Sequence, residues 1–142
     1  VYARVREENV YSLLRGADVV VDGMDTFRER LLVNKACVKL RIPFVHAAVH
    51  GLAGQLMTVI PGETPCYQCL IPEELPTVET PVLGAVSGLL GCLEALEAVK
   101  LIAGIGRPMA GRLLVFDGLT MEFREVEVKR RDNCPACGGL KL

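Results

Sequence analysis

The chain has 142 residues, a formal net charge of −1 at pH 7 and 51% hydrophobic residues. This length and composition are typical of one globular domain that buries a core. Lys and Arg are spread along the chain and Trp is absent, which argues against a nucleic-acid-binding surface or a polybasic membrane patch.

The first half of the chain predicts a strand–helix–strand unit. After a short helix over 8–15, the valine-rich run 17–22 predicts a strand covered on both faces, as in a parallel sheet. Thr26 and Glu29 form a capping-box signal ahead of a helix from Phe27 to about Arg41, and a second strand is expected over 44–49. Together these elements predict a right-handed βαβ crossover.

The second half predicts three more strands and one long helix. Gly51 and Gly54 indicate a hairpin-like return into a strand over 55–60. A loop over 61–81 shows no helical period, and further strands are expected over 112–117 and 121–129. The alternation of the last strand slips near Arg124 and Glu125, which predicts a bulge. The fold class is α/β, with a Rossmann-like mixed sheet.

The most apolar stretch, 82–105, contains Glu94, Glu97 and Lys100. Three charges in mid-segment would be costly in lipid, so we predict a buried helix and no membrane span. Glycines at its start are expected to permit close backbone approach to a neighbour, and these are Gly84, Gly88 and Gly91. Cys37 and Cys92 stand alone in helical contexts and are expected to be small buried hydrophobes.

Four cysteines form two Cys-x-x-Cys pairs, Cys66 with Cys69 and Cys134 with Cys137. Two such pairs complete the tetrahedral four-thiolate site of structural zinc. The metal would tie a mid-chain loop to the carboxyl tail. The alternatives are two unrelated pairs or one redox pair, but neither pair follows a strand and opens a helix as a thioredoxin-like motif would. A cytoplasmic metal site is favoured over a disulfide framework.

A turn rich in carboxylates, 22–26, follows the first strand and precedes the predicted helix. Ligands of open α/β sheets bind at that edge, and a carboxylate such as Asp25 suits Mg²⁺. Arg30 lies one turn into the helix and could steady the carboxylate or a phosphate. The simpler alternative is that Asp25 or Thr26 caps the helix and Arg30 is solvated. His46 is expected to be a hydrogen-bonded core or edge residue, and His50 could approach the ligand crevice.

An ordered set of segments strongly resembles the ThiF/MoeB/HesA family, the prokaryotic relatives of ubiquitin-activating enzymes. The matching segments cover essentially the whole chain, and they are 22–30, Asn34, 51–55, 61–69, 91–100 and 117–138. The resemblance implies a mixed-sheet α/β domain, a homodimer and a four-cysteine zinc site. It also implies Mg-ATP-dependent adenylation of the carboxyl-terminal glycine of a small ubiquitin-like sulfur carrier.

The resemblance assigns roles to individual residues. The family's magnesium-linked aspartate falls on Asp25, its helix arginine on Arg30, and Asn34 is implied to contact the cofactor. The family's glycine-rich nucleotide loop has no counterpart here, because no Gly-x-Gly-x-x-Gly occurs in the chain. Residues 1–142 are therefore expected to form the carboxyl-side portion of one adenylating domain, and the absent initiator Met agrees. Thr77 falls about where some members carry a sulfur-handling cysteine.

Two functions follow for the chain. The first is ATP-dependent adenylation by the parent enzyme. The alternative is a catalytically incomplete module that dimerises or binds a ubiquitin-like partner. A dehydrogenase-type dinucleotide domain is excluded because the glycine fingerprint is missing.

Overall fold

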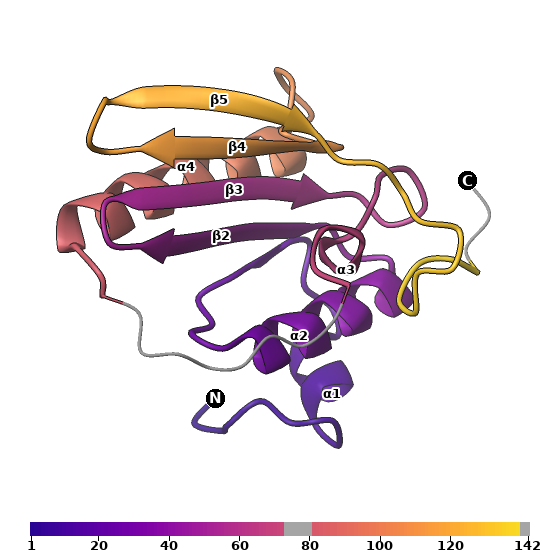
Figure 1. Ribbon diagram of the computed structural model, residues 1–142. Coiled ribbons are helices and arrows are strands. Elements are labelled where there is room, and N and C mark those ends of the chain that lie inside the picture. The colour runs from indigo at the N-terminus through magenta and orange to yellow at the C-terminus, as the bar shows by residue number, and fades with distance from the viewer. Residues whose placement is uncertain (73–80, 140–142) are drawn as a thin grey trace.

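The computed structural model describes residues 1–72 and 81–139, and Figure 1 shows the arrangement of the elements. In chain order they are α1 (Val10–Leu14), β1 (Val20–Val21), α2 (Phe27–Leu40), β2 (Phe44–His50), β3 (Ala53–Val59), α3 (Tyr67–Leu70), α4 (Gly84–Ala103), β4 (Arg112–Asp117) and β5 (Glu122–Glu127).

The strands form one mixed sheet in the order β1-β2-β3-β4-β5. β1 pairs with β2 in parallel, and every later pairing in the sheet is antiparallel. The helix α4 packs behind β2 and β3 (Figure 1), and its Val86 and Leu90 belong to one buried cluster with Val45 and Leu56. On the other face, α2 packs against Phe44 and Met57 and is itself contacted by α1. The predicted α/β mixed sheet is confirmed.

The predicted capping box starts α2 as expected. Thr26 has extended backbone angles, and its Oγ1 accepts a hydrogen bond from the Glu29 amide at 3.2 Å. This bond satisfies one of the amides that a helix start leaves without an intrahelical partner. At the other end, Arg41 adopts a left-handed conformation with φ of 57° and closes the helix. The capping box involves residues only three positions apart, so its formation does not depend on the tertiary structure.

Two strand predictions are wrong in detail. The expected strand over 17–22 is reduced to Val20 and Val21, and Val21 is 45% exposed. β1 lies at the edge of the described sheet with β2 as its neighbouring strand, while Val19 and Val20 pack against two different core clusters. The expected bulge near Arg124 is absent, because β4 and β5 pair without interruption from Arg112↔Glu127 to Asp117↔Glu122.

Three further expectations, on the loop over 61–81, on the glycines of α4 and on Cys92, are wrong. The segment predicted as a loop contains the short helix α3. A Cβ added at each of the three predicted close-approach glycines would meet nothing within 4 Å among the described residues, these being Gly84, Gly88 and Gly91. The close approach lies instead at Gly54, where a Cβ would stand 2.6 Å from Leu90 Cδ2. Cys92 is exposed rather than buried, whereas Cys37 is buried as expected.

The polarity of α4 is inverted with respect to an ordinary surface helix. Glu94 and Glu97 are buried against the sheet, while Leu96, Val99 and Ile102 are more than half exposed. The prediction that this helix is buried is therefore correct for one face only. In the part of the chain that the structure describes, no helix has the length and apolar character that crossing a bilayer requires.

Candidate functional site

A pocket of about 740 Å³ opens where β1 and β2 end and β3 begins. Its walls are the start of α2, the end of β2 and the start of β3, and the lining residues are Met24–Phe27, Arg30, Ala48–His50, Ala53–Gln55, Val82 and Val115. The volume suits a small organic ligand, and the carboxyl ends of parallel strands are the usual place for one. The amino end of α2 faces this space, and its unpaired amides favour an anion there.

Asp22 is the polar centre beneath this pocket, and its side chain is completely buried. Its Oδ1 accepts a hydrogen bond from the Met24 amide at 2.8 Å. Its Oδ2 lies 2.6 Å from His46 Nδ1 and 3.0 Å from Arg30 Nε. The buried carboxylate is thus paired with a cation and bonded at both oxygens, as a buried charge must be.

His46 continues this network across the sheet. Its ring is completely buried, and burial is the main reason that its pKa lies below the usual value, although the adjacent Asp22 opposes the shift. Its Nε2 faces the Gln55 amide nitrogen at 3.3 Å. A neutral ring that donates from Nδ1 to Asp22 and accepts at Nε2 satisfies both contacts. The expectation of a hydrogen-bonded core histidine is confirmed.

The predicted site residues are only partly brought together. Asp25 is exposed and lines the pocket together with Arg30 and His50. The guanidinium of Arg30 pairs with the Asp22 carboxylate and donates to the Met24 carbonyl oxygen. Arg30 therefore holds a carboxylate, but among the described contacts that carboxylate is Asp22 and not Asp25. Thr77 lies outside the described residues.

Asn34 lies away from the pocket lining, inside the core. Its Oδ1 accepts a hydrogen bond from the Tyr67 amide at 3.0 Å, next to the first cysteine pair. The amide of Asn34 also opposes the raised pKa that burial imposes on the Cys66 thiol. The structure therefore places Asn34 beside the cysteine loop, and its contact with a nucleotide stays a prediction.

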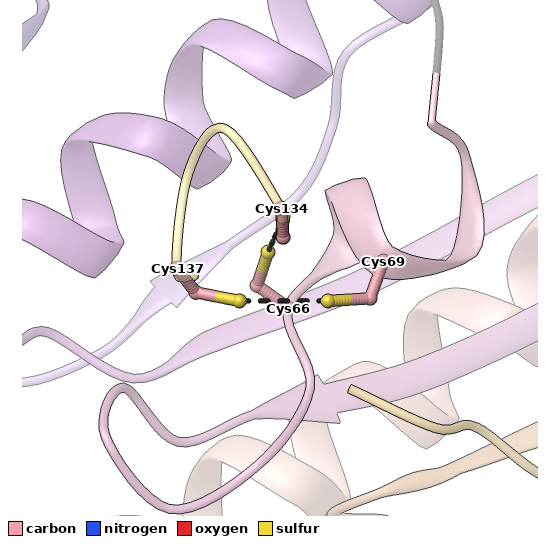
Figure 2. Close-up of side chains that lie close together, drawn as sticks. All are labelled: Cys66, Cys69, Cys134 and Cys137. Atoms are coloured by element: carbon pink, nitrogen blue, oxygen red, sulfur yellow. Dashed lines mark hydrogen bonds between the residues drawn. The ribbon is translucent and has the colours of Figure 1, made fainter. Parts of the chain in front are cut away.

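The four predicted metal ligands converge in a second site, shown in Figure 2. Their sulfur atoms all lie within 4.8 Å of one another, and all four residues are buried. Cys66 and Cys134 are 3.7 Å apart at sulfur, and Cys69 and Cys137 are 3.4 Å apart. These spacings exclude disulfides, whose sulfurs are about 2.05 Å apart. A tetrahedron with Zn–S bonds of about 2.3 Å has sulfur–sulfur edges of about 3.8 Å, so the cluster fits zinc.

The backbone around the second pair also suits a metal. Burial raises the pKa of Cys134, but amide hydrogen bonds from Cys137 and Ala136 outweigh it and lower the pKa to about 7. The Gly138 amide donates to the Cys134 carbonyl oxygen at 2.8 Å. A Cβ at Gly138 would stand 2.3 Å from the Asp132 carbonyl oxygen, so only glycine fits this tight turn. Amide groups that point at a sulfur stabilise the thiolate, which is the form that binds a metal.

The sequence reasoning missed the roles of Asp22, His46 and Gln55. Asp22 belongs to the carboxylate-rich turn, yet only Asp25 was singled out from it. The signal was available in the strand register, because Val21 pairs with Val45 and the next positions are Asp22 and His46. The predicted βαβ unit makes the two strands parallel neighbours, but it does not say which residues pair, and that pairing comes from the structure.

Comparison with known proteins gives one consistent family. The model of the ThiF family matches residues 1–136. The chain is 47% identical over 94% of its length to the protein HesA of Nostoc sp., of which it covers 54%. It is 43% identical over 97% of its length to the SAMP-activating enzyme E1 of Haloferax volcanii, covering 53%. The chain thus spans about half the length of these relatives.

A further relative is longer still, and solved structures agree on the fold. The adenylyltransferase and sulfurtransferase MOCS3-1 of Drosophila pseudoobscura pseudoobscura is 40% identical over 97% of the chain, which covers 32% of that protein. Among solved structures, E. coli MccB in complex with MccA-N7isoASN matches with a TM-score of 0.82 at 18% identity, over 98% of this chain and 46% of that one.

Proposed function

The chain belongs to the ThiF family, and from that membership we propose that it forms the pocket-bearing and metal-bearing portion of an adenylating enzyme. The substrate is the carboxyl-terminal glycine of a small ubiquitin-like sulfur carrier, and the co-substrate is Mg-ATP. The single observation that supports this most is the pocket of about 740 Å³ with Asp25 and Arg30 in its lining, at the start of α2. Two relatives named for activation or adenylyl transfer support the reaction class.

The reaction needs little covalent chemistry from the protein. A carboxylate oxygen of the terminal glycine attacks the α-phosphorus of ATP and forms a new oxygen–phosphorus bond. The bond from the α-phosphorus to the bridging oxygen breaks, and pyrophosphate leaves with the electron pair. The protein must hold two anions together and offset the growing charge.

The residues of the pocket suit these two tasks. The amides at the start of α2 and the guanidinium of Arg30 favour phosphate oxygens. Asp25 offers one exposed carboxylate, and Mg²⁺ is typically bound by one or two carboxylates together with substrate phosphates. When bound there, the ion would neutralise phosphate charge. Asp25 acts as its ligand and not as a general base.

The four cysteines serve the fold. All four tetrahedral positions of a zinc ion would be occupied by Cys66, Cys69, Cys134 and Cys137, which leaves no open position for a substrate. The site joins the loop before α3 to the segment after β5. We therefore assign the zinc a structural role.

A second candidate is a catalytically incomplete module that dimerises or binds a ubiquitin-like partner. The outward apolar face of α4 favours it, because Leu96, Val99 and Ile102 are 58%, 54% and 66% exposed. A homodimer through this face is compatible with either candidate. We also propose a cytoplasmic location, because a thiolate metal site needs reduced cysteines and that compartment keeps thiols reduced.

The test is ATP–pyrophosphate exchange catalysed by the protein that contains this chain. We expect exchange that depends on a carrier with a terminal glycine, that is lost when this glycine is removed, and that falls at least tenfold in Asp25→Ala. Asp18→Ala is the matched control, because Asp18 is an exposed carboxylate outside the pocket lining. Exchange that is equal in both variants would reject the role of Asp25. Exchange independent of any carrier would reject the proposed substrate.

A further inference from the structure

Two buried side chains next to the pocket have no part in the proposed chemistry. Asp22 and His46 have no exposed side-chain surface, and both lie directly behind residues that line the pocket. Burying a carboxylate and an imidazole costs free energy unless hydrogen bonds or an opposite charge compensate for the lost water. Their contacts show what that is.

The carboxylate of Asp22 fixes two parts of one pocket wall. Its Oδ1 holds the Met24 amide at 2.8 Å, and Met24 directly precedes Asp25 in the turn. Its Oδ2 pairs with Arg30 Nε at 3.0 Å. Arg30 in turn donates to the Met24 carbonyl oxygen. The turn that presents Asp25 and the guanidinium of Arg30 are therefore placed by the same carboxylate.

The imidazole of His46 joins that wall to the opposite one. Nδ1 donates to Asp22 at 2.6 Å, and Nε2 faces the amide of Gln55 at 3.3 Å. Gln55 lies in β3 and lines the pocket from the sheet. The ring is held in place by Tyr67, whose ring centroid is 4.2 Å away at a tilt of 48°. The ring therefore has one orientation, with a contact at each nitrogen.

We propose that His46 and Asp22 are positioning residues that keep the two walls of the pocket in a fixed relation. His46 holds Asp22 in the single rotamer that binds Met24 and Arg30, and it holds the Gln55 side chain on the other wall. This inference rests on the proposed function only in taking the pocket as the Mg-ATP site. A displacement of about 1 Å at such a wall is enough to cost a large factor in a positioned reaction.

Two isosteric substitutions separate the two contacts of the ring. In His46→Asn the amide nitrogen takes the place of Nδ1, so the bond to Asp22 is kept and the contact with Gln55 is lost. In His46→Gln the longer side chain reaches the place of Nε2, so the bond to Asp22 is lost. Because each variant breaks one of the two contacts that join the walls, we expect Mg-ATP affinity to fall at least threefold in His46→Asn and at least tenfold in His46→Gln, which also releases the carboxylate that holds Met24. Wild-type affinity in either variant would overturn the proposal.

A second readout does not depend on nucleotide. In the free protein, we expect ¹⁵N NMR to show a protected Met24 amide in the wild type and in His46→Asn, because this amide donates to Asp22 Oδ1. The Met24 amide should exchange at least tenfold faster in His46→Gln. An unchanged Met24 signal in a folded His46→Gln protein, with normal zinc content, would overturn the positioning role.

The two readouts also separate this inference from the proposed function. If the wild-type protein binds no Mg-ATP, the proposed function fails, while the NMR comparison still decides the positioning role. If His46→Gln does not fold, Asp22→Ala replaces it, because this variant removes the oxygen that accepts the hydrogen bond from the Met24 amide. A Met24 amide that exchanges as slowly in Asp22→Ala as in the wild type would then overturn the proposal.

Discussion

Glu94 lies on the buried face of α4, and its environment favours the uncharged carboxylic acid. Burial raises its pKa from 4.5 to about 8, and the charge of Asp22 adds to the shift, while Arg30 and the Ala47 amide oppose it. One of its oxygens, Oε1, has no hydrogen-bond partner among the described residues. A carboxyl whose folded pKa is raised binds more protons in the native state than in the unfolded state. Its contribution to stability therefore falls as pH rises.

The change Glu94→Gln tests this directly. We compare the free energy of unfolding of the wild type with that of Glu94→Gln. We expect the wild-type value to fall relative to the variant by up to about 1.4 kcal/mol per pH unit between roughly pH 4.5 and pH 8. Above about pH 8 the difference should become constant. The variant should be the more stable protein at pH 8, because it buries no charge there. Urea unfolding of both proteins at several pH values measures the difference. A difference that does not vary with pH would show that Glu94 is ionised in the folded protein.

Gly138 is the residue on which the geometry of the second cysteine pair depends. A methyl group there would overlap the carbonyl oxygens of Asp132 and Cys134 at 2.3 and 2.7 Å, whereas one at Gly139 would meet nothing within 4 Å. We expect Gly138→Ala to weaken zinc binding by about 1–3 kcal/mol and Gly139→Ala to leave it unchanged. Competition for zinc with a chromophoric chelator measures both. Equal affinities in the two variants would contradict the fit of this turn to the metal.

At the scale of elements, α4 is attached to the sheet by a buried carboxylate. Glu97 Oε2 accepts hydrogen bonds from Thr58 Oγ1 at 2.6 Å and from the Met109 amide at 2.7 Å, and Lys100 pairs with the other oxygen. One side chain thus joins α4, β3 and the segment that leads into β4.

Removal of this carboxylate should loosen three elements together. We expect Glu97→Ala to lower the free energy of unfolding by about 3 kcal/mol, because a buried hydroxyl and a buried amide lose their partner. Glu97→Gln keeps one oxygen acceptor and should cost clearly less. Chemical denaturation measures both changes. A loss below about 0.5 kcal/mol in Glu97→Ala would mean that water replaces the carboxylate and that the contact does not hold α4.

The elements also show how far sequence reasoning reaches. The capping box at Thr26 and the spacing of the cysteine pairs were interpreted correctly, because both signals act within a few residues or follow from ligand chemistry. The length of β1, the exposure of Cys92 and the open space around Gly88 were predicted wrongly. Each of these depends on which elements lie next to each other in space. The Asp22–His46 contact was missed because it depends on the register between two parallel strands, which the predicted βαβ unit leaves open.

At the scale of the whole molecule, the outward face of α4 is apolar along much of its length. Leu96, Val99 and Ile102 lie on it, and no described segment covers them. Exposed apolar patches of this kind mark interaction surfaces. A homodimer that buries the face twice would satisfy the rule that a two-fold interface pairs one patch with itself.

A charge in this face should therefore separate the subunits. We expect Val99→Glu to shift the protein from dimer to monomer in sedimentation velocity, because a buried unpaired carboxylate is costly in an interface. Leu119→Glu is the control, since Leu119 is 79% exposed and lies outside α4, in the turn between β4 and β5. A wild-type protein that is already monomeric at micromolar concentration would contradict the dimer. So would a Val99→Glu protein that stays dimeric.

Calorimetry measures whether the pocket beside Asp25 binds Mg-ATP, as we propose. The measurement compares the wild type, Asp25→Ala and the control Asp18→Ala under the same conditions. We expect saturable binding by the wild type and by Asp18→Ala, with an affinity at least tenfold weaker in Asp25→Ala. Absence of binding at millimolar ATP, or equal affinity in all three proteins, would contradict it.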